Sequence, residues 1–155
     1  DPSVDLVFIH WMVPHTPYVY DGKSKQYLKV INEERHELYF DNMMLADKIP
    51  ENIFTSLRKS GLHQETAVLI SSDHHWRRSK KEWDGTLDWR VPFIIVLPNG
   101  GKPLKYKRPF NTKLSRALIV KIMSGQIKSN TDIAEFISKR TSNVINVGET
   151  PKSDR

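Results

Sequence analysis

The sequence predicts a single α/β domain built around a largely parallel sheet. Three short apolar runs, at residues 4–12, 66–70 and 90–98, are rich in aliphatic and β-branched residues, as buried strands are. A long stretch with helical spacing of apolar residues separates the first two runs, and two more helical patterns follow the third. Each run ends in a polar loop, so the residues that follow the strands are candidates for ligand binding at one edge of the sheet.

The first run leads into a loop that carries two histidines, His10 and His15. Two prolines, Pro14 and Pro17, indicate a loop and fix its backbone, which lowers the entropy cost of holding the imidazole rings. This arrangement is typical of a loop that binds a metal or an anion. The alternative is a packed surface loop, since Trp and Tyr residues lie beside the histidines.

Residues 21–29 are polar and turn-like, and a helical pattern begins at about residue 33. Apolar residues then recur at spacings of three and four and predict one buried helix face, formed by Tyr39, Met43, Ala46, Ile49, Ile53 and Leu57. We expect the tyrosine and the methionines of this helix to lie in the core. Pro50 predicts a kink or a split, and Gly61 is expected to end the helix as its C′ residue.

The second run ends in the most informative stretch of the chain, Asp73-His74-His75. Carboxylate oxygens and imidazole nitrogens are ordinary ligands of zinc and similar divalent ions. Two neighbouring residues can share one metal only if the loop turns sharply. The alternative is that Asp73 caps a turn and the histidines are half-buried loop residues.

Residues 76–90 contain three tryptophans and show neither helical nor strand periodicity. We interpret them as an irregular loop that covers the site, because three indoles are costly to leave in water. Arg77 follows the Asp-His-His stretch and is expected to bind an anionic substrate through its guanidinium group.

Two amphipathic helices are predicted after the third run, at residues 112–124 and 131–139. Thr131 or Asn130 is the expected cap of the second helix. The predicted domain spans residues 1–141, and the polar residues 142–155 are expected to form a flexible tail.

The 155-residue chain carries a net charge of +6, but its Lys and Arg residues are scattered rather than gathered on one periodic face. We therefore interpret them as a solvated surface and expect no nucleic-acid partner. No apolar run approaches the roughly 20 residues that cross a bilayer, so we expect no membrane segment in these residues. The absence of cysteine excludes disulfides, thiolate zinc sites and cysteine nucleophiles within them.

Three motifs together resemble, in order and spacing, the C-terminal half of the sulfatase and alkaline phosphatase superfamily. They are Pro14-His15-Thr16-Pro17, Ser72-Asp73-His74 and Arg90-Val91-Pro92. The resemblance covers roughly residues 4–124. It implies a three-layer α/β/α sandwich with a largely parallel sheet, as a partial, C-terminal version of the alkaline-phosphatase-like fold.

The resemblance implies a portion of a metal-dependent hydrolase or transferase that acts on phosphoric or sulfuric esters. It assigns Asp73 and His74 to the shell of a divalent metal, which would be zinc, manganese or calcium. It places His10 and His15 against the substrate or leaving group, with Arg77 as the clamp for an anionic ester. An extracytoplasmic or membrane-associated parent protein is compatible with this family.

Two features depart from the family pattern. His75 stands where the family has Gly, and the family's nucleophile lies on an N-terminal half that precedes the matched motifs. We therefore expect this chain to be inactive alone, to bind metal weakly and to need the missing half as a partner. Two alternatives stay open. One is a non-catalytic binding or scaffold remnant of the fold, and the other is a DHH-type phosphoesterase, which needs further aspartates on an earlier loop.

Overall fold

The computed structural model describes residues 5–32, 38–76, 85–86 and 88–141. The chain divides into two compact units, a first unit at Asp1–His63 and a second unit at Gln64–Arg155. Helices and strands are mixed in both units, which confirms the α/β class. The predicted tail at 142–155 lies outside the described residues, and the single domain predicted over 1–141 stays a prediction.

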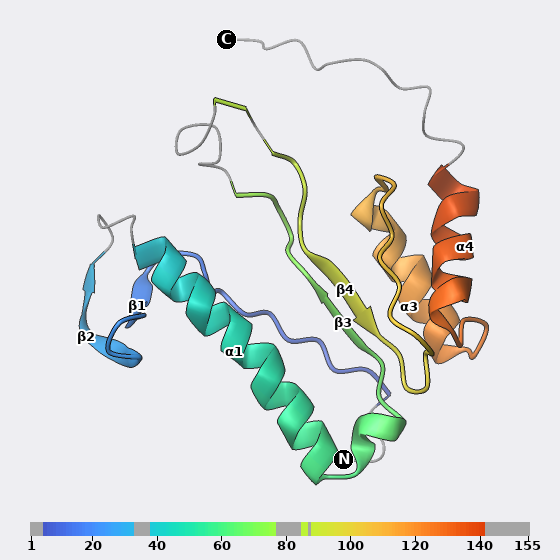
Figure 1. Ribbon diagram of the computed structural model, residues 1–155, viewed down its shortest axis with the longest axis horizontal. Helices are drawn as coiled ribbons and strands as arrows, with labels where there is room; N and C mark the ends of the chain where they lie inside the picture. The colour runs from blue at the N-terminus through green and yellow to red at the C-terminus, as the bar shows by residue number, and fades with distance from the viewer. Residues whose placement is uncertain (1–4, 33–37, 77–84, 87, 142–155) are drawn as a thin grey trace. The chain divides into compact units, whose positions relative to one another are not determined.

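The first unit contains an antiparallel hairpin and one long helix (Figure 1). Strand β1 (Tyr18–Asp21) pairs with β2 (Gln26–Asn32), and β1 packs on helix α1 (Leu38–Lys59). The Asp21 carboxylate closes the turn by accepting hydrogen bonds from the amides of Lys23 (2.8 Å) and Ser24 (3.3 Å). The predicted turn-like segment therefore ends at residue 25, because strand β2 begins at Gln26.

Helix α1 continues through Pro50 as one helix, so the predicted split is absent. Gly61 has a φ of +78° and follows the helix, as predicted for a C′ residue. The predicted core face is partly wrong. Met43 and Met44 are 45% and 46% exposed, and the buried positions of α1 are Leu38, Asn42 and Leu45. The buried stripe in the first half of α1 is thus offset from the predicted one, because the hairpin packs on the helix at these positions.

The strand predicted at residues 4–12 is wrong for residues 5–12, which the structure describes as irregular chain. Their apolar side chains lie open to solvent, with Leu6 57% and Phe8 86% exposed. A strand forms only where another strand accepts and donates its backbone hydrogen bonds. None of the described strands pairs with this segment.

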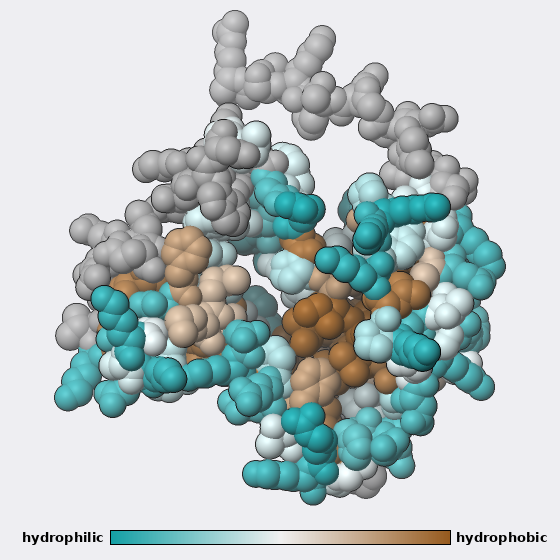
Figure 2. Space-filling model, viewed as in Figure 1, coloured by the Kyte–Doolittle hydropathy of each residue, from teal (hydrophilic) through white to brown (hydrophobic). Residues whose placement is uncertain are grey.

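The second unit begins with strands β3 (Val68–Ser71) and β4 (Phe93–Val96) at the predicted places. They pair antiparallel, with Val68 opposite Val96, so the prediction of a parallel arrangement is wrong for this pair. A parallel pair needs a long crossover, usually a helix, whereas irregular chain follows β3 and precedes β4 among the described residues. Hydrophobic side chains gather over the β3–β4 pair in Figure 2. Two side chains of β4, Ile94 and Val96, are exposed.

Helices α3 (Ser115–Met123) and α4 (Asn130–Thr141) confirm the two predicted C-terminal helices. They pack beside β4 around one hydrophobic core (Figure 1), which consists of Leu97, Leu118, Ile127, Phe136 and Ile137. Two short 3-10 helices, at Leu62–Gln64 and Thr112–Leu114, complete the described elements. Among these elements, no helix is both long and apolar enough to cross a membrane.

Ser129, not Thr131 or Asn130, caps α4. Its hydroxyl accepts the amide of Asp132 (3.1 Å), while the Asp132 carboxylate accepts the amides of Ser129 and Lys128 (2.9 Å each). This reciprocal pair is a capping box. Asn130 instead donates its side-chain amide to the carbonyl of Lys102 (2.9 Å), which ties α4 to the loop after β4.

The capping box predicts unequal effects of two neighbouring substitutions. Ser129→Ala should lower the free energy of unfolding by about 1 kcal/mol, because one amide at the helix start loses its partner. Thr131→Ala should leave it unchanged or slightly higher, since Ala is the better helix former. Chemical denaturation of both variants measures the difference, and a larger loss in Thr131→Ala would contradict the assignment.

Candidate functional site

The Asp73-His74 loop follows β3 directly and turns sharply, as a shared metal would require. Ser72 Oγ donates to the carbonyl of His74 (2.7 Å), and the His74 amide donates to Asp73 Oδ1 (3.0 Å). Both bonds link residues at most two apart, so the turn is built from local side-chain to backbone contacts. The side chains of Asp73 and His74 therefore project from one tight turn at the end of a strand.

One hydrogen bond determines which nitrogen of His74 is free. The Nδ1–H group of His74 donates to the carbonyl oxygen of His75 (2.7 Å), and a carbonyl can only accept. In the neutral ring the lone pair is then on Nε2. Metal-binding histidines commonly have their other ring nitrogen fixed by such a bond, which sets the tautomer.

The free nitrogen of His74 lies close to the carboxylate of Asp73. Nε2 is 3.9 Å from Oδ1. Two ligands of a tetrahedral ion, with bonds of about 2.1 Å, would be about 3.4 Å apart, so a small side-chain rotation brings this pair into range. The Asp73 side chain is 79% exposed and that of His74 35%, so an ion can reach both. The donor set and spacing of the pair fit a divalent metal.

The pair has two protein ligands rather than three or four. Within the part of the chain that the structure describes, no three His, Asp or Glu side chains come close enough to hold one ion. His75, the nearest additional candidate, instead packs on Trp89, with ring centroids 4.4 Å apart. Structural and catalytic zinc sites normally use at least three protein ligands, so this pair alone should bind metal weakly.

His75 is compatible with the shape of the loop even though the family pattern has Gly there. Glycine is required only where φ is positive, and the non-glycine residues with positive φ in the described segments are Lys25 and Asn99. His75 is therefore free of that strain. Its contact with Trp89 also joins the Asp73 loop to the segment that precedes β4.

The segment before β4 carries an ion pair that sequence analysis missed. Arg90 donates to both carboxylate oxygens of Asp88, from Nε (2.8 and 3.0 Å) and from an Nη atom (2.6 Å). These bonds hold the pKa of the Asp88 carboxyl at about 2, below its ordinary 3.8. Residues two apart share one side of an extended chain, so the Asp-x-Arg spacing was the available signal. Arg77, the predicted anion clamp, lies outside the described residues.

In the first unit, Nδ1 of His15 also contacts the carbonyl of the following residue, as Nδ1 of His74 does, but it has the hydroxyl of Thr16 as a second neighbour. The Nδ1–H group of His15 donates to the carbonyl of Thr16 (3.0 Å), and Thr16 Oγ1 is 3.2 Å from the same nitrogen. Nε2 is again left with the lone pair in the neutral ring. The His15 amide donates to the carbonyl of Met12 (2.8 Å), which closes a turn, and His10 is exposed in the chain that leads to it.

Asn42 is the second feature that sequence analysis missed. It is fully buried, and its side chain contacts the backbone of the His15 loop at three points and the amide of Val19 in β1 at a fourth. The available signal was a polar residue in the helical spacing Leu38, Asn42, Leu45. His10 and His15 belong to the first unit and Asp73 and His74 to the second, so a shared site stays a prediction.

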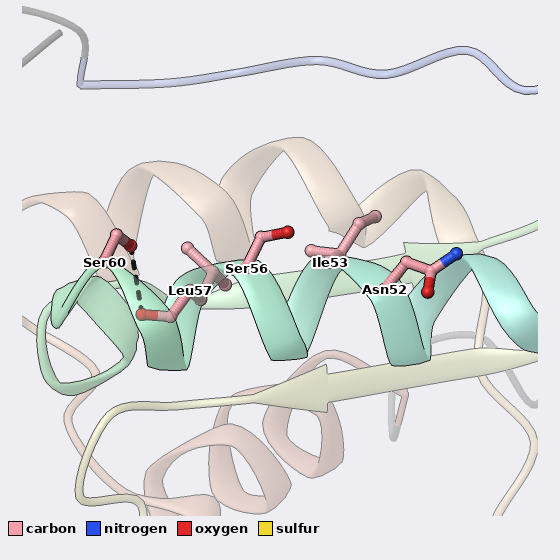
Figure 3. A pocket seen from close by; sticks show the side chains of 5 residues that line it. All are labelled: Asn52, Ile53, Ser56, Leu57 and Ser60. Atoms are coloured by element: carbon pink, nitrogen blue, oxygen red, sulfur yellow. Dashed lines mark hydrogen bonds between the residues drawn. The ribbon is translucent and has the colours of Figure 1, made fainter.

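A shallow hollow on α1 does not resemble a catalytic site. Figure 3 shows its five lining side chains, which are Asn52, Ile53, Ser56, Leu57 and Ser60. None of them titrates near neutral pH or is a usual metal ligand. The Ser60 hydroxyl donates to the carbonyl of Leu57 (3.1 Å), as the dashed line shows, and so stabilises the helix end.

The ion pair before β4 predicts a defined pH dependence. Because the folded pKa of Asp88 is below the ordinary value, the pair stabilises the fold above about pH 4. That contribution should disappear as the pH falls through about 2. Arg90→Met should raise the carboxyl midpoint of Asp88 from about 2 towards 3.8, as followed by carbon NMR of the side chain. Arg108→Met is the control, and an unchanged midpoint in Arg90→Met would contradict the pairing.

Comparison with known proteins gives one match. The profile of the Sulfatase family matches residues 5–132, which is most of the chain and includes both histidine loops and the strands between them. No curated protein and no solved structure matches the chain. Since the family profile extends over more than three quarters of the sequence, this chain belongs to the sulfatase family.

Proposed function

We propose that this chain carries part of the metal-binding site of a hydrolase or transferase that acts on phosphoric or sulfuric esters. The observation that supports it is the Asp73–His74 pair, in which the tautomer of His74 presents Nε2 3.9 Å from Asp73 Oδ1. Membership of the sulfatase family supports ester substrates and a divalent ion. The family match also favours this proposal over a DHH-type phosphoesterase.

Asp73 and His74 would hold the divalent ion. When bound, the ion polarises the ester oxygens and stabilises the charge that develops on them. Imidazole suits zinc and carboxylate suits manganese, so a mixed pair is compatible with either ion, whereas calcium prefers oxygen ligands throughout. We therefore favour zinc or manganese over calcium.

His15 is the residue that we propose to act on the leaving group. With Nδ1–H engaged by the carbonyl of Thr16, the proton that the ring gains or loses is on Nε2. A protonated Nε2 can donate to the leaving-group oxygen as a general acid. His10 would contact the anionic ester, and Arg77 would clamp its oxygens.

The nucleophile would come from outside these residues. Ser71 and Ser72 are the hydroxyls nearest to the metal pair in sequence, and both donate to backbone carbonyls, of Ser72 (3.1 Å) and His74 (2.7 Å). A hydroxyl committed to a carbonyl, without a base as partner, is a poor nucleophile. These bonds support a separate N-terminal half as the partner that completes the site.

We further propose that the three-layer sandwich forms only with that half. Phe8, Ile94 and Val96 are 86%, 52% and 41% exposed, and exposed apolar strands and segments need covering. Additional strands beside residues 5–12 and the β3–β4 pair would bury this surface and produce the largely parallel sheet.

Metal binding separates this proposal from a non-catalytic scaffold. The purified chain should bind zinc or manganese weakly, and more weakly as the pH falls and protons compete for the imidazole. Asp73→Ala and His74→Ala should each abolish the heat of binding in calorimetry, without changing the far-UV circular dichroism. His63→Ala is the matched control. Equal zinc affinity in the parent and both loop variants would mean that the Asp-His pair is an ordinary turn.

Catalysis provides the second test. We expect the chain alone to hydrolyse neither aryl phosphates nor aryl sulfates, because loss of a nucleophile costs orders of magnitude in rate. Turnover would be followed with chromogenic esters in the presence of zinc and of manganese. Turnover that depends on metal and is lost in His74→Ala would place the nucleophile within these residues and refute this part of the proposal.

A further inference from the structure

The side chain of Asn42 attaches the His15 loop to α1. Asn42 has no exposed surface, and 27 residues separate it from His15 in the sequence. Its Nδ2 group lies 3.3 Å from the carbonyl oxygen of His15, 3.4 Å from that of Pro17 and 3.5 Å from that of Pro14. Its Oδ1 atom accepts the amide of Val19 (3.1 Å).

The orientation of the amide follows from these partners. Three of them are carbonyls and can only accept, while the Val19 amide can only donate, so Nδ2 must face the carbonyls and Oδ1 the amide. Nδ2 has two hydrogens for three acceptors, and the bonds are therefore shared. A flipped amide would place an oxygen against three oxygens at a site that water does not reach.

The contacts of Asn42 lie at and on both sides of His15, the residue that would act on the leaving group. Asn42 binds the carbonyl of His15 itself and the carbonyls on either side, at Pro14 and Pro17. Thr16, whose carbonyl accepts the hydrogen bond from the His15 ring, lies between His15 and Pro17, and Asn42 binds the carbonyls of both. We propose that Asn42 is a positioning residue, which holds the backbone of this loop so that the His15 ring keeps its Nδ1–H tautomer and presents Nε2.

The inference rests on the role proposed for His15, but it concerns the ring rather than turnover. Because Asn42 is fully buried, water cannot replace its side-chain amide as the donor if that amide is removed. The carbonyls of the loop would then turn towards solvent and carry the Thr16 carbonyl away from the imidazole. A role in packing alone would leave the tautomer unchanged.

Nitrogen NMR of the His15 ring in the full chain provides the test, at about pH 8.5, where an ordinary imidazole is neutral. The parent should show two well-separated ring nitrogens, with the proton on Nδ1. In Asn42→Leu, which keeps the branched shape of the side chain but no polar group, the two signals should move together as the tautomers mix. Asn52→Leu, on the exposed part of the same helix, should match the parent.

Asn42→Asp separates the loop contacts from the bond to β1. The carboxylate can still accept the amide of Val19 but cannot donate to the three carbonyls. We expect it to lose the single tautomer as Asn42→Leu does. A parent-like tautomer in either folded variant would overturn the proposal. If both variants unfold, hydrogen exchange is measured in the parent instead. Asn42 side-chain protons that exchange freely with water would equally contradict the proposal.

Zinc calorimetry distinguishes this inference from the proposed function. Asn42→Leu should leave the affinity of the Asp73–His74 pair unchanged. A parent protein that binds no zinc would refute the metal site and leave the His15 tautomer result unaffected. A single tautomer in every variant would refute the role of Asn42 and leave the metal site intact.

Discussion

His15 and His74 each donate the Nδ1–H group to the carbonyl oxygen of the following residue, and the chemistry of both loops depends on that bond. At His74 the acceptor is His75, and at His15 it is Thr16. In each case Nε2 becomes the nitrogen that can bind a metal or carry a transferable proton. The ring orientation therefore follows the backbone of its own loop, and whatever holds that backbone determines what the histidine can do.

The two loops are held in different ways, so the shape of one follows from its own motif and the shape of the other does not. Ser72 and the Asp73 carboxylate close their turn through bonds to residues one or two positions away, so the motif itself contains the geometry. The His15 loop depends on Asn42, from a helix 27 residues later. A buried asparagine at an apolar helix position indicates that a polar partner exists, but the identity of that partner depends on the fold.

The same distinction between local and distant interactions applies to the fold. Apolar runs located β3 and β4, and helical spacing located α1, α3 and α4. Pairing direction depends on how the chain returns between strands, so the antiparallel β3–β4 pair could not be derived from two apolar runs. Burial depends on neighbours in the same way. Phe8 lies in an apolar run but outside any described strand, and Met43 has helical spacing but lies beside the face that the hairpin covers.

His15 illustrates how one tautomer can serve two different roles. A metal ligand must offer the lone pair of Nε2, whereas a general acid must carry a proton there. A divalent ion nearby favours the first state, because it repels an imidazolium. As a ligand of an ion, the ring would remain neutral. Farther from the ion it could remain protonated and assist the leaving group. The distance between the ring and the ion therefore decides which role the same nitrogen performs.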